Sequence, residues 1–242
     1  MLIIEICKSP FFGRNINRSF PAIFRLNREE QGNLRRFREV RGEMQPTHAI
    51  RLHQAVSWFR CAEQYADTDD DISFITLWIA LNSCYAINDQ NDQHEERSEF
   101  KNFTDTLVQL DAQEKIYNCL WMNHSKFVRM LIDSQYVFPP FWKSQIDGDE
   151  SWKPKFDASR KRAKHALANS EVSVLLSIVF DRLYVLRNQL IHGGATHQSQ
   201  VNREQVINGK RMLIELLPVV IELMFDDKQD WGDIYYPVIE NN

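Results

Sequence analysis

The sequence predicts an all-α protein, a helical bundle built from amphipathic helices joined by short polar links. Three observations favour this fold class. Hydrophobic residues recur at helical spacing through most of the chain, and no alternating pattern long enough for a clear strand stands out. One nearly continuous apolar segment is also long enough for a buried central helix. Long amphipathic segments with short connections are typical of helix bundles.

Composition divides the chain into three parts. Residues 1–46 hold nine Lys/Arg and five Glu, so we expect a basic N-terminal extension on a more acidic body. Residues 47–225 are expected to form the helical domain, and residues 226–242 an acidic, aromatic tail. The extension is either an arm that faces RNA or a solvated or partner-covered segment, and composition leaves both alternatives open.

Overall charge restricts the classes of function. The 242 residues are 43% hydrophobic and 26% charged, with a formal net charge of -4. This composition fits a globular protein without a global basic field, so any RNA contact must depend on local groups of Lys and Arg. We find no convincing signal peptide and no apolar run long enough to span a bilayer. The sequence therefore predicts a cytoplasmic protein without membrane contact.

The cysteines give no sign of a metal or disulfide framework. Cys7, Cys61, Cys84 and Cys119 form no CxxC pair and no Cys/His cluster with zinc-like spacing. We therefore expect reduced thiols, three of them within apolar helical patterns. Neither a metal nor a cofactor is predicted.

The helices can be placed along the chain from their apolar residues. Residues 72–87 are apolar on nearly all sides, which is typical of a central helix. Residues 113–133 are also expected to be helical, and a final helix should end near Phe225. A helix over 171–192 should end at Gly193–Gly194, a strong stop signal. Its apolar stripe consists of Val172, Leu175, Leu176, Val179, Leu183, Leu186 and Leu190.

Residues 134–157 interrupt this helical pattern. Pro139–Pro140 and Gly148 break regular structure, so we expect an aromatic-rich loop or insertion. Its aromatic residues are Tyr136, Phe138, Phe141, Trp142, Trp152 and Phe156. The basic residues that follow are Arg160, Lys161, Arg162 and Lys164. These groups either stack bases and bind phosphates, or form a packed loop beside a solvated helix face.

Three polar residues at the end of the 171–192 helix are the strongest candidates for a catalytic site. Asn188 and His192 are four apart and share one face, and the long Arg187 side chain reaches the same rim. In RNA the 2′-hydroxyl can attack its own phosphate, so cleavage requires neither an external nucleophile nor a metal. A His can transfer the protons and an Arg can stabilise the developing charge. An Asn can orient the substrate or the His by hydrogen bonds.

Spacing alone does not define this site. An Arg-x4-His segment also occurs from Arg160 to His165, but only the segment at Arg187 has Asn directly after Arg. A structural role also fits the same residues, with Arg187 as a surface cation and His192 as a helix cap.

The Arg-Asn-x-x-x-His segment, at the end of an apolar-striped helix and before a final apolar helix, resembles the HEPN superfamily. Phe74–Asn82 is similar to the core helix in the first half of the Apea-like HEPN group. The resemblance covers about residues 47–225, apart from 134–157. It implies a helical bundle that forms a homodimer, in which two copies of Arg187, Asn188 and His192 make a composite RNase site.

The resemblance also implies partners and a biological role. Many HEPN proteins act without a metal in toxin–antitoxin, abortive-infection or other defence systems, so RNA is the expected substrate. An antitoxin or regulatory protein is a further expected partner. HEPN toxins controlled by a nucleotidyltransferase carry Tyr two residues after the His, where this chain has Gly194. Control by modification of that Tyr is therefore not expected.

Two functions remain from the sequence. The first is a metal-independent endoribonuclease that cleaves RNA by 2′-hydroxyl attack at a dimer-interface site, as a defence or toxin effector. The second is a non-catalytic HEPN-like module that binds RNA or a nucleotide, or that serves in assembly.

Overall fold

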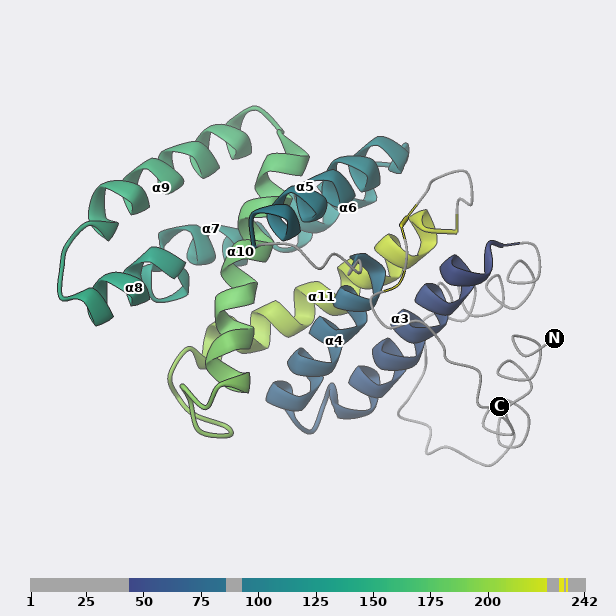
Figure 1. Ribbon diagram of the computed structural model, residues 1–242, viewed down its shortest axis with the longest axis horizontal. Coiled ribbons are helices and arrows are strands. Elements are labelled where there is room, and N and C mark those ends of the chain that lie inside the picture. Colours follow the sequence, from purple (N-terminus) through teal and green to yellow (C-terminus); the bar gives the residue numbers. More distant parts are fainter. Residues whose placement is uncertain (1–43, 86–92, 226–230, 233, 235–242) are drawn as a thin grey trace.

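The computed structural model describes residues 44–85, 93–225, 231–232 and 234, and this part of the chain is a helical bundle (Figure 1). The predicted all-α fold class is thus confirmed. In chain order the elements are α3 (Pro46–Tyr65), α4 (Asp70–Tyr85), α5 (Gln93–Leu110), α6 (Lys115–Tyr117), the π-helix η1 (Asn118–Asn123), α7 (Ser125–Asp133), the 3-10 helix η2 (Gln135–Val137), α8 (Pro139–Asp147), α9 (Trp152–Ala168), α10 (Val172–Ile191) and α11 (Arg203–Leu223).

Helix α4 occupies the centre of the bundle, as its all-round apolar character predicted. It packs against α3, α11, α10 and α5. Asp69 caps its first turn, because the carboxylate accepts hydrogen bonds from the N–H groups of Asp71 and Ile72. Two further acids in that turn, Asp70 and Asp71, favour the same helix start.

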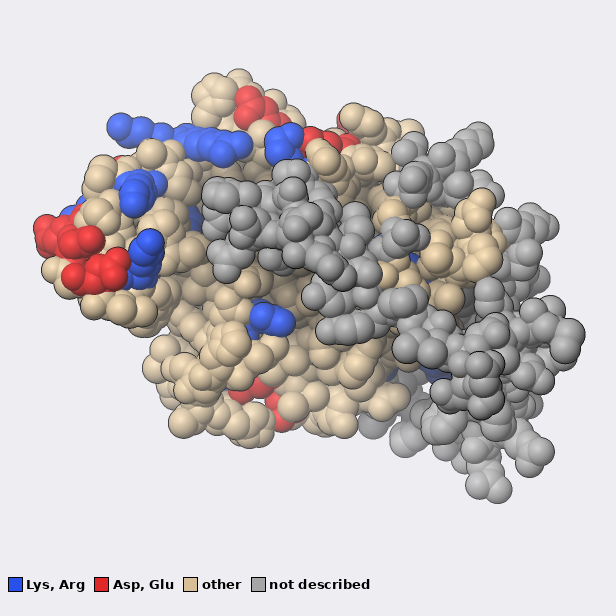
Figure 2. Space-filling view, in the orientation of Figure 1, with Lys and Arg blue, Asp and Glu red and all other residues tan. Residues whose placement is uncertain are grey.

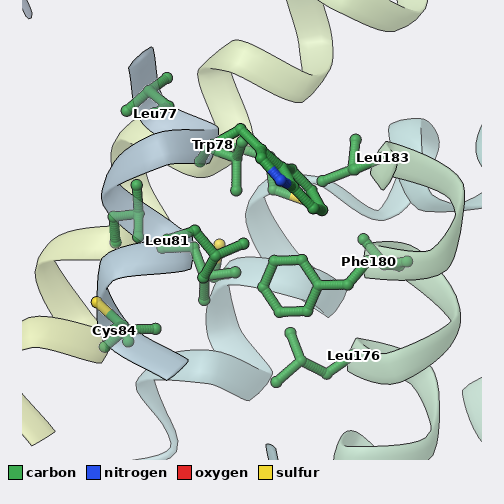
Figure 3. Close-up of a cluster of buried hydrophobic side chains, with 14 of the residues drawn as sticks. Leu77, Trp78, Leu81, Cys84, Leu176, Phe180 and Leu183 are labelled. Carbon is green, nitrogen blue, oxygen red and sulfur yellow. The ribbon is translucent and has the colours of Figure 1, made fainter. Parts of the chain in front are cut away.

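Helix α10 crosses α4 and presents the predicted apolar stripe to it. Leu175, Leu176, Val179, Leu183 and Leu186 are buried, and the two ends of the stripe are partly buried. Figure 3 shows side chains of α10, among them Phe180, facing those of α4. The end of α10 that carries the candidate site is therefore fixed by a packed core.

A close approach of three helices is possible because residue 209 is glycine. A Cβ atom at Gly209 of α11 would lie 3.0 Å from a ring carbon of Phe74 and 3.1 Å from a methyl carbon of Leu183. The absence of a side chain therefore lets α11 approach both α4 and α10.

The expectation of a loop over 134–157 was wrong for most of that segment. Helix α8 fills residues 139–147, and α9 begins at Trp152. The two prolines occupy the first turn of α8, where a missing N–H costs nothing, and Gly148 caps its end with φ 71°. The residues that suggested a break delimit a short helix instead. The domain boundaries predicted from composition remain predictions.

The N-terminal extension lies outside the described residues except for its last three positions, and nearly all of the tail over 226–242 does too. No helix in the described part is both long and apolar enough to cross a membrane. Cys84 and Cys119 are buried, and burial raises the pKa of each thiol to about 12.

Candidate functional site

The candidate site begins where α10 ends. The N–H of His192 donates to the carbonyl of Asn188, and Gly193 then turns the chain with φ 70°. The N–H of Ala195 returns to the carbonyl of Gln189, so the last turn is closed. The predicted glycine stop is thus confirmed, because the positive φ of Gly193 favours glycine over other residues.

Arg187 and Asn188 contact each other directly. Nη1 of Arg187 donates to Oδ1 of Asn188 at 2.8 Å. The guanidinium carbon also lies 5.9 Å from the centre of the Tyr184 ring, within the range of a cation–π contact. Among the described residues, Arg187 forms no ion pair, and its buried Nε has no hydrogen-bond partner. The guanidinium is therefore held by a neutral amide and keeps its charge available.

His192 stands apart from this pair within one chain. It is the exposed C-cap of α10, and no hydrogen bond joins its imidazole to Arg187 or Asn188. The structure thus brings the first two motif residues together and leaves the third at the rim. Any site that uses all three needs a substrate or a second chain to connect them.

The solvent-facing side of α10 is apolar around the motif. Tyr184, Asn188 and Ile191 follow helical spacing, so they share a face. The side chains of Tyr184 and Ile191 are 41% and 44% exposed. In Figure 2 the surface over the lower half of α10 is largely uncharged. Large apolar side chains beside a cation are typical of interaction surfaces.

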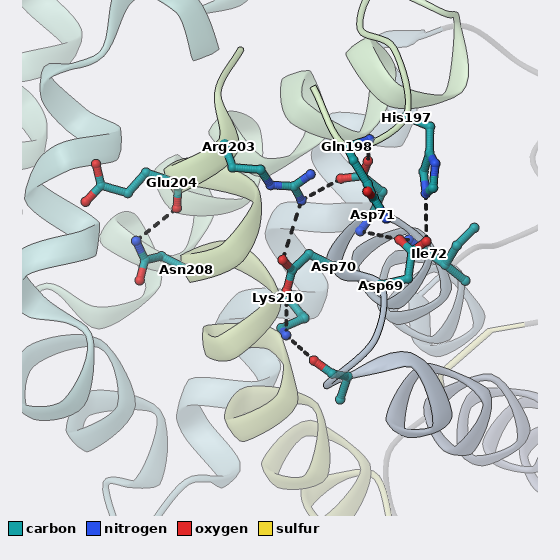
Figure 4. A network of polar contacts seen from close by, with 11 residues as sticks. Asp69, Asp70, Asp71, Ile72, His197, Gln198, Arg203, Glu204, Asn208 and Lys210 are labelled. Carbon is teal, nitrogen blue, oxygen red and sulfur yellow. Dashed lines mark hydrogen bonds and ion pairs between the residues drawn. The ribbon is translucent and has the colours of Figure 1, made fainter. Parts of the chain in front are cut away.

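A polar network holds the loop that follows the motif (Figure 4). Nε2 of His197 lies 2.7 Å from Oδ2 of Asp69, and the N–H of Gln198 donates to Oδ2 of Asp71 at 2.7 Å. Nη2 of Arg203 contacts Oδ1 of the same Asp71 at 2.6 Å. Because Asp71 is buried, this pair ties the loop firmly to the start of α4.

Gln189 connects the motif helix to two other segments. Its amide nitrogen donates to the carbonyl of Tyr136 at 3.0 Å, and its amide oxygen accepts from Asn202 at 2.7 Å. Trp142 donates to the same Tyr136 carbonyl through Nε1. The aromatic segment therefore packs beside the motif. Sequence reasoning missed Gln189, which lies inside the motif but carried no separate signal.

Most aromatic residues of this segment are used for packing. Phe138, Phe141 and Phe156 are buried in a small second core. Phe138 lies under the guanidinium of Arg182, 4.4 Å from its carbon. Arg182 is itself buried, and burial lowers its pKa to about 10. The partly exposed Tyr136 and Trp142 are the aromatic side chains here that remain accessible to a ligand.

The basic residues predicted to bind RNA lie on α9 and divide into two pairs. Arg160 and Lys164 face the same oxygen of Asp133, at 2.7 Å and 3.7 Å. Lys161 and Arg162 are exposed, with no ion-pair partner in the described part of the chain. Figure 2 shows Lys and Arg side chains along α9. Of these four residues, only Lys161 and Arg162 therefore offer unpaired charge.

Two groups of described residues could hold a metal ion, and neither includes the motif. One consists of Cys119, His124 and Glu215. The other is formed by Asp69, Asp71 and His197 of the network above. Sequence reasoning anticipated neither group, because each joins residues far apart in the chain.

No family model, no curated protein and no solved structure matches this chain. The resemblance to the HEPN superfamily therefore remains a prediction from the residues themselves. It depends on the Arg187–His192 segment and on the apolar helices on either side of it.

Proposed function

We propose that this chain is a metal-independent endoribonuclease of the HEPN type, whose active site combines Arg187, Asn188 and His192 from two copies. The main support is the state of Arg187. A guanidinium held at 2.8 Å by a neutral amide, without a carboxylate partner among the described residues, can stabilise charge on a phosphate.

The proposed reaction follows from the groups present. The 2′-oxygen of RNA attacks the adjacent phosphorus, so an O2′–P bond forms and the P–O5′ bond breaks. One His192 imidazole accepts the 2′ proton, and a second donates a proton to the leaving 5′ oxygen. Arg187 stabilises the charge on the phosphorane. The products are a 2′,3′-cyclic phosphate and a 5′-hydroxyl.

A homodimer is part of this proposal, because one chain supplies a single His192. In a twofold interface the same patch meets itself. The exposed Tyr184 and Ile191 provide apolar area on the face that bears Asn188, and Trp78 of α4 supports the Tyr184 ring at 6.0 Å. Such an interface would place two His192 side chains near two Arg187 side chains.

The test is cleavage of RNA by the purified full chain with a chelator present. Wild type should release fragments that end in 2′,3′-cyclic phosphate. Arg187→Ala and His192→Ala should fail while they remain folded dimers by circular dichroism and light scattering. If wild type leaves structured and unstructured RNA intact, the catalytic proposal is wrong.

The alternative is a module that binds RNA or a nucleotide, or that serves in assembly. It would be supported if the wild type bound RNA or formed dimers without cutting, and if His192→Ala changed neither property. A role as a defence or toxin effector, with an antitoxin or regulatory partner, depends on the resemblance alone. Growth arrest on expression of wild type, absent with His192→Ala, would support that role.

A further inference from the structure

Three side chains with metal-binding atoms, none of them part of the motif, meet between η1 and α11. Cys119 belongs to η1, His124 follows it directly, and Glu215 comes from α11. Their sulfur, nitrogen and oxygen atoms all lie within 4.8 Å of one another. Nε2 of His124 is 3.1 Å from Oε2 of Glu215.

The π-helix explains why Cys119 and His124 face the same point. In an α-helix, residues five apart are rotated by about 140° and cannot share a ligand. A π-turn closes its hydrogen bond between residues five apart, and here the N–H of His124 donates to the carbonyl of Cys119 at 3.0 Å. The local departure from α geometry therefore aligns the two side chains. Such π-turns are frequent at functional sites.

The His124 nitrogen is the second observation that indicates a ligand. Nε2 is buried and has no hydrogen-bond partner, although the Glu215 carboxylate is close. The two atoms are thus near each other without being aligned for a hydrogen bond. Asn123 donates to the same Oε2 at 3.0 Å and holds the carboxylate in place. At 3.1 Å the two groups form an ion pair when His124 is protonated, and with a neutral imidazole the same two atoms can ligate one cation.

We propose that Cys119, His124 and Glu215 bind one Zn²⁺ ion. A sulfur, an imidazole nitrogen and a carboxylate oxygen are the three donor types that Zn²⁺ prefers. Tetrahedral coordination with bonds of about 2.0–2.1 Å separates a nitrogen and an oxygen ligand by about 3.3 Å. The observed 3.1 Å is close to that value. Glu215 is half exposed, so a water from that side can take the fourth position. Binding releases the thiol proton to solvent.

The other group, Asp69, Asp71 and His197, does not share these features. Asp69 caps α4, and Asp71 pairs with Arg203. The carboxylates of Asp69 and Asp71 therefore already bond to other groups of the protein, and the His197 side chain is mostly exposed. Of the two groups, only the Cys119 group combines a buried imidazole nitrogen without a hydrogen bond and a local π-helix that aligns its ligands. Zn²⁺ there would join the start of α7 to α11 and stabilise their packing, independently of the motif.

The experiment uses the full chain with Cys7→Ser and Cys61→Ser, which leaves the two buried thiols as the remaining sulfur ligands. Titration with Zn²⁺ should show one equivalent bound and a higher unfolding temperature, because only the folded state binds. Co²⁺ in its place should give a thiolate-to-metal charge-transfer band. Cys119→Ser should abolish that band.

Glu215→Gln and Glu222→Gln form the matched pair on α11. Glu222 already pairs with Lys115, so its substitution should leave Zn²⁺ affinity unchanged. Glu215→Gln should weaken affinity at least tenfold, on the order of the loss seen for altered metal sites. Because Glu215 is half exposed, this variant should still fold. Equal Zn²⁺ affinity in the two variants, or a Co²⁺ complex without the thiolate band, would overturn the site.

Discussion

The chain contains two Arg-x4-His segments, and the structure places them in opposite electrostatic surroundings. On α9, Arg160 contacts Asp133 at 2.7 Å, and His165 lies 3.3 Å from Glu171. On α10, Arg187 contacts only the neutral Asn188, and His192 caps the helix without a carboxylate partner among the described residues. The Arg and the His of the first segment both face carboxylates of the same chain, whereas Arg187 and His192 face none among the described residues.

This difference shows what distinguishes a candidate site from a chance spacing. A cation already paired with a carboxylate must give up that contact before it can bind a phosphate. A cation held by an amide is oriented without being neutralised. The same sequence spacing therefore has different consequences, which depend on residues brought in from other helices, such as Asp133 of α7.

The largest expected effect compares His192→Ala with His165→Ala. Loss of a general acid–base group typically costs about 10²–10⁴-fold, so His192→Ala should reduce the rate of RNA cleavage by that order. His165→Ala should leave the rate near wild type, because His165 is exposed and paired with Glu171. Cleavage of a labelled RNA by both variants measures the contrast. Equal losses in the two variants would mean that the α10 segment has no special role.

Much of this contrast could not be predicted from sequence. The apolar stripe from Leu175 to Leu186 predicts a helix with one buried face, so the position of the motif at the end of that helix was predictable. The Asn after Arg187 also singled out this segment. The pairing of Arg160 with Asp133 could not be predicted, because 27 positions separate them and only the packing of α7 on α9 brings them together.

The proposed Zn²⁺ site and the aromatic segment over 134–157 could not be predicted fully from sequence for the same reason. An α-helix over 113–133 would point Cys119 and His124 in different directions, whereas the structure has a π-helix at Asn118–Asn123 that aligns them. Pro139–Pro140 predicts a break in regular structure, although proline also suits the first turn of a helix. In both cases a local pattern was compatible with two backbone geometries, and tertiary packing selected one.

The second prediction exchanges the neighbours of the two arginines, so that Arg187 faces a carboxylate and Arg160 faces an amide. Asn188→Asp would place a carboxylate beside Arg187, as Asp133 stands beside Arg160, and should lower the cleavage rate on the order of 10²-fold. Asp133→Asn would remove the nearer of the two carboxylates beside Arg160, with Asp157 remaining at 3.8 Å, and should leave the cleavage rate unchanged. Thermal unfolding should confirm that both variants fold. A faster Asp133→Asn enzyme would show instead that α9 limits the reaction.

The third prediction tests whether the α10 face meets a second copy. Ile191→Asp buries a charge in the proposed interface and should weaken dimerisation about tenfold to a hundredfold. Ile146→Asp on α8 is the control, because that side chain is 86% exposed and lies on another element. Light scattering over a range of concentrations measures both. If Ile191→Asp dimerises as well as wild type, the interface lies elsewhere.

The smallest expected effect concerns the loop that follows the α10 segment. Burial alone would raise the pKa of Asp69, but hydrogen bonds from the N–H of Ile72 and from His197 lower it below 3.8. A depressed folded pKa means that the ionised carboxylate stabilises the protein above that value. This contribution is lost as the pH falls through the folded pKa.

Asp69→Asn isolates this contribution, because Asn still caps the helix as well as Asp does. The variant should unfold at a lower temperature than wild type near neutral pH, and the gap should close as the pH falls through the lowered pKa of Asp69. Other carboxylates titrate in both proteins, so their effects cancel in the difference. A gap that stays constant with pH would mean that Asp69 anchors the loop through packing rather than charge. If the loop positions His192, the rate of RNA cleavage by Asp69→Asn should differ from that of wild type over the same range of pH.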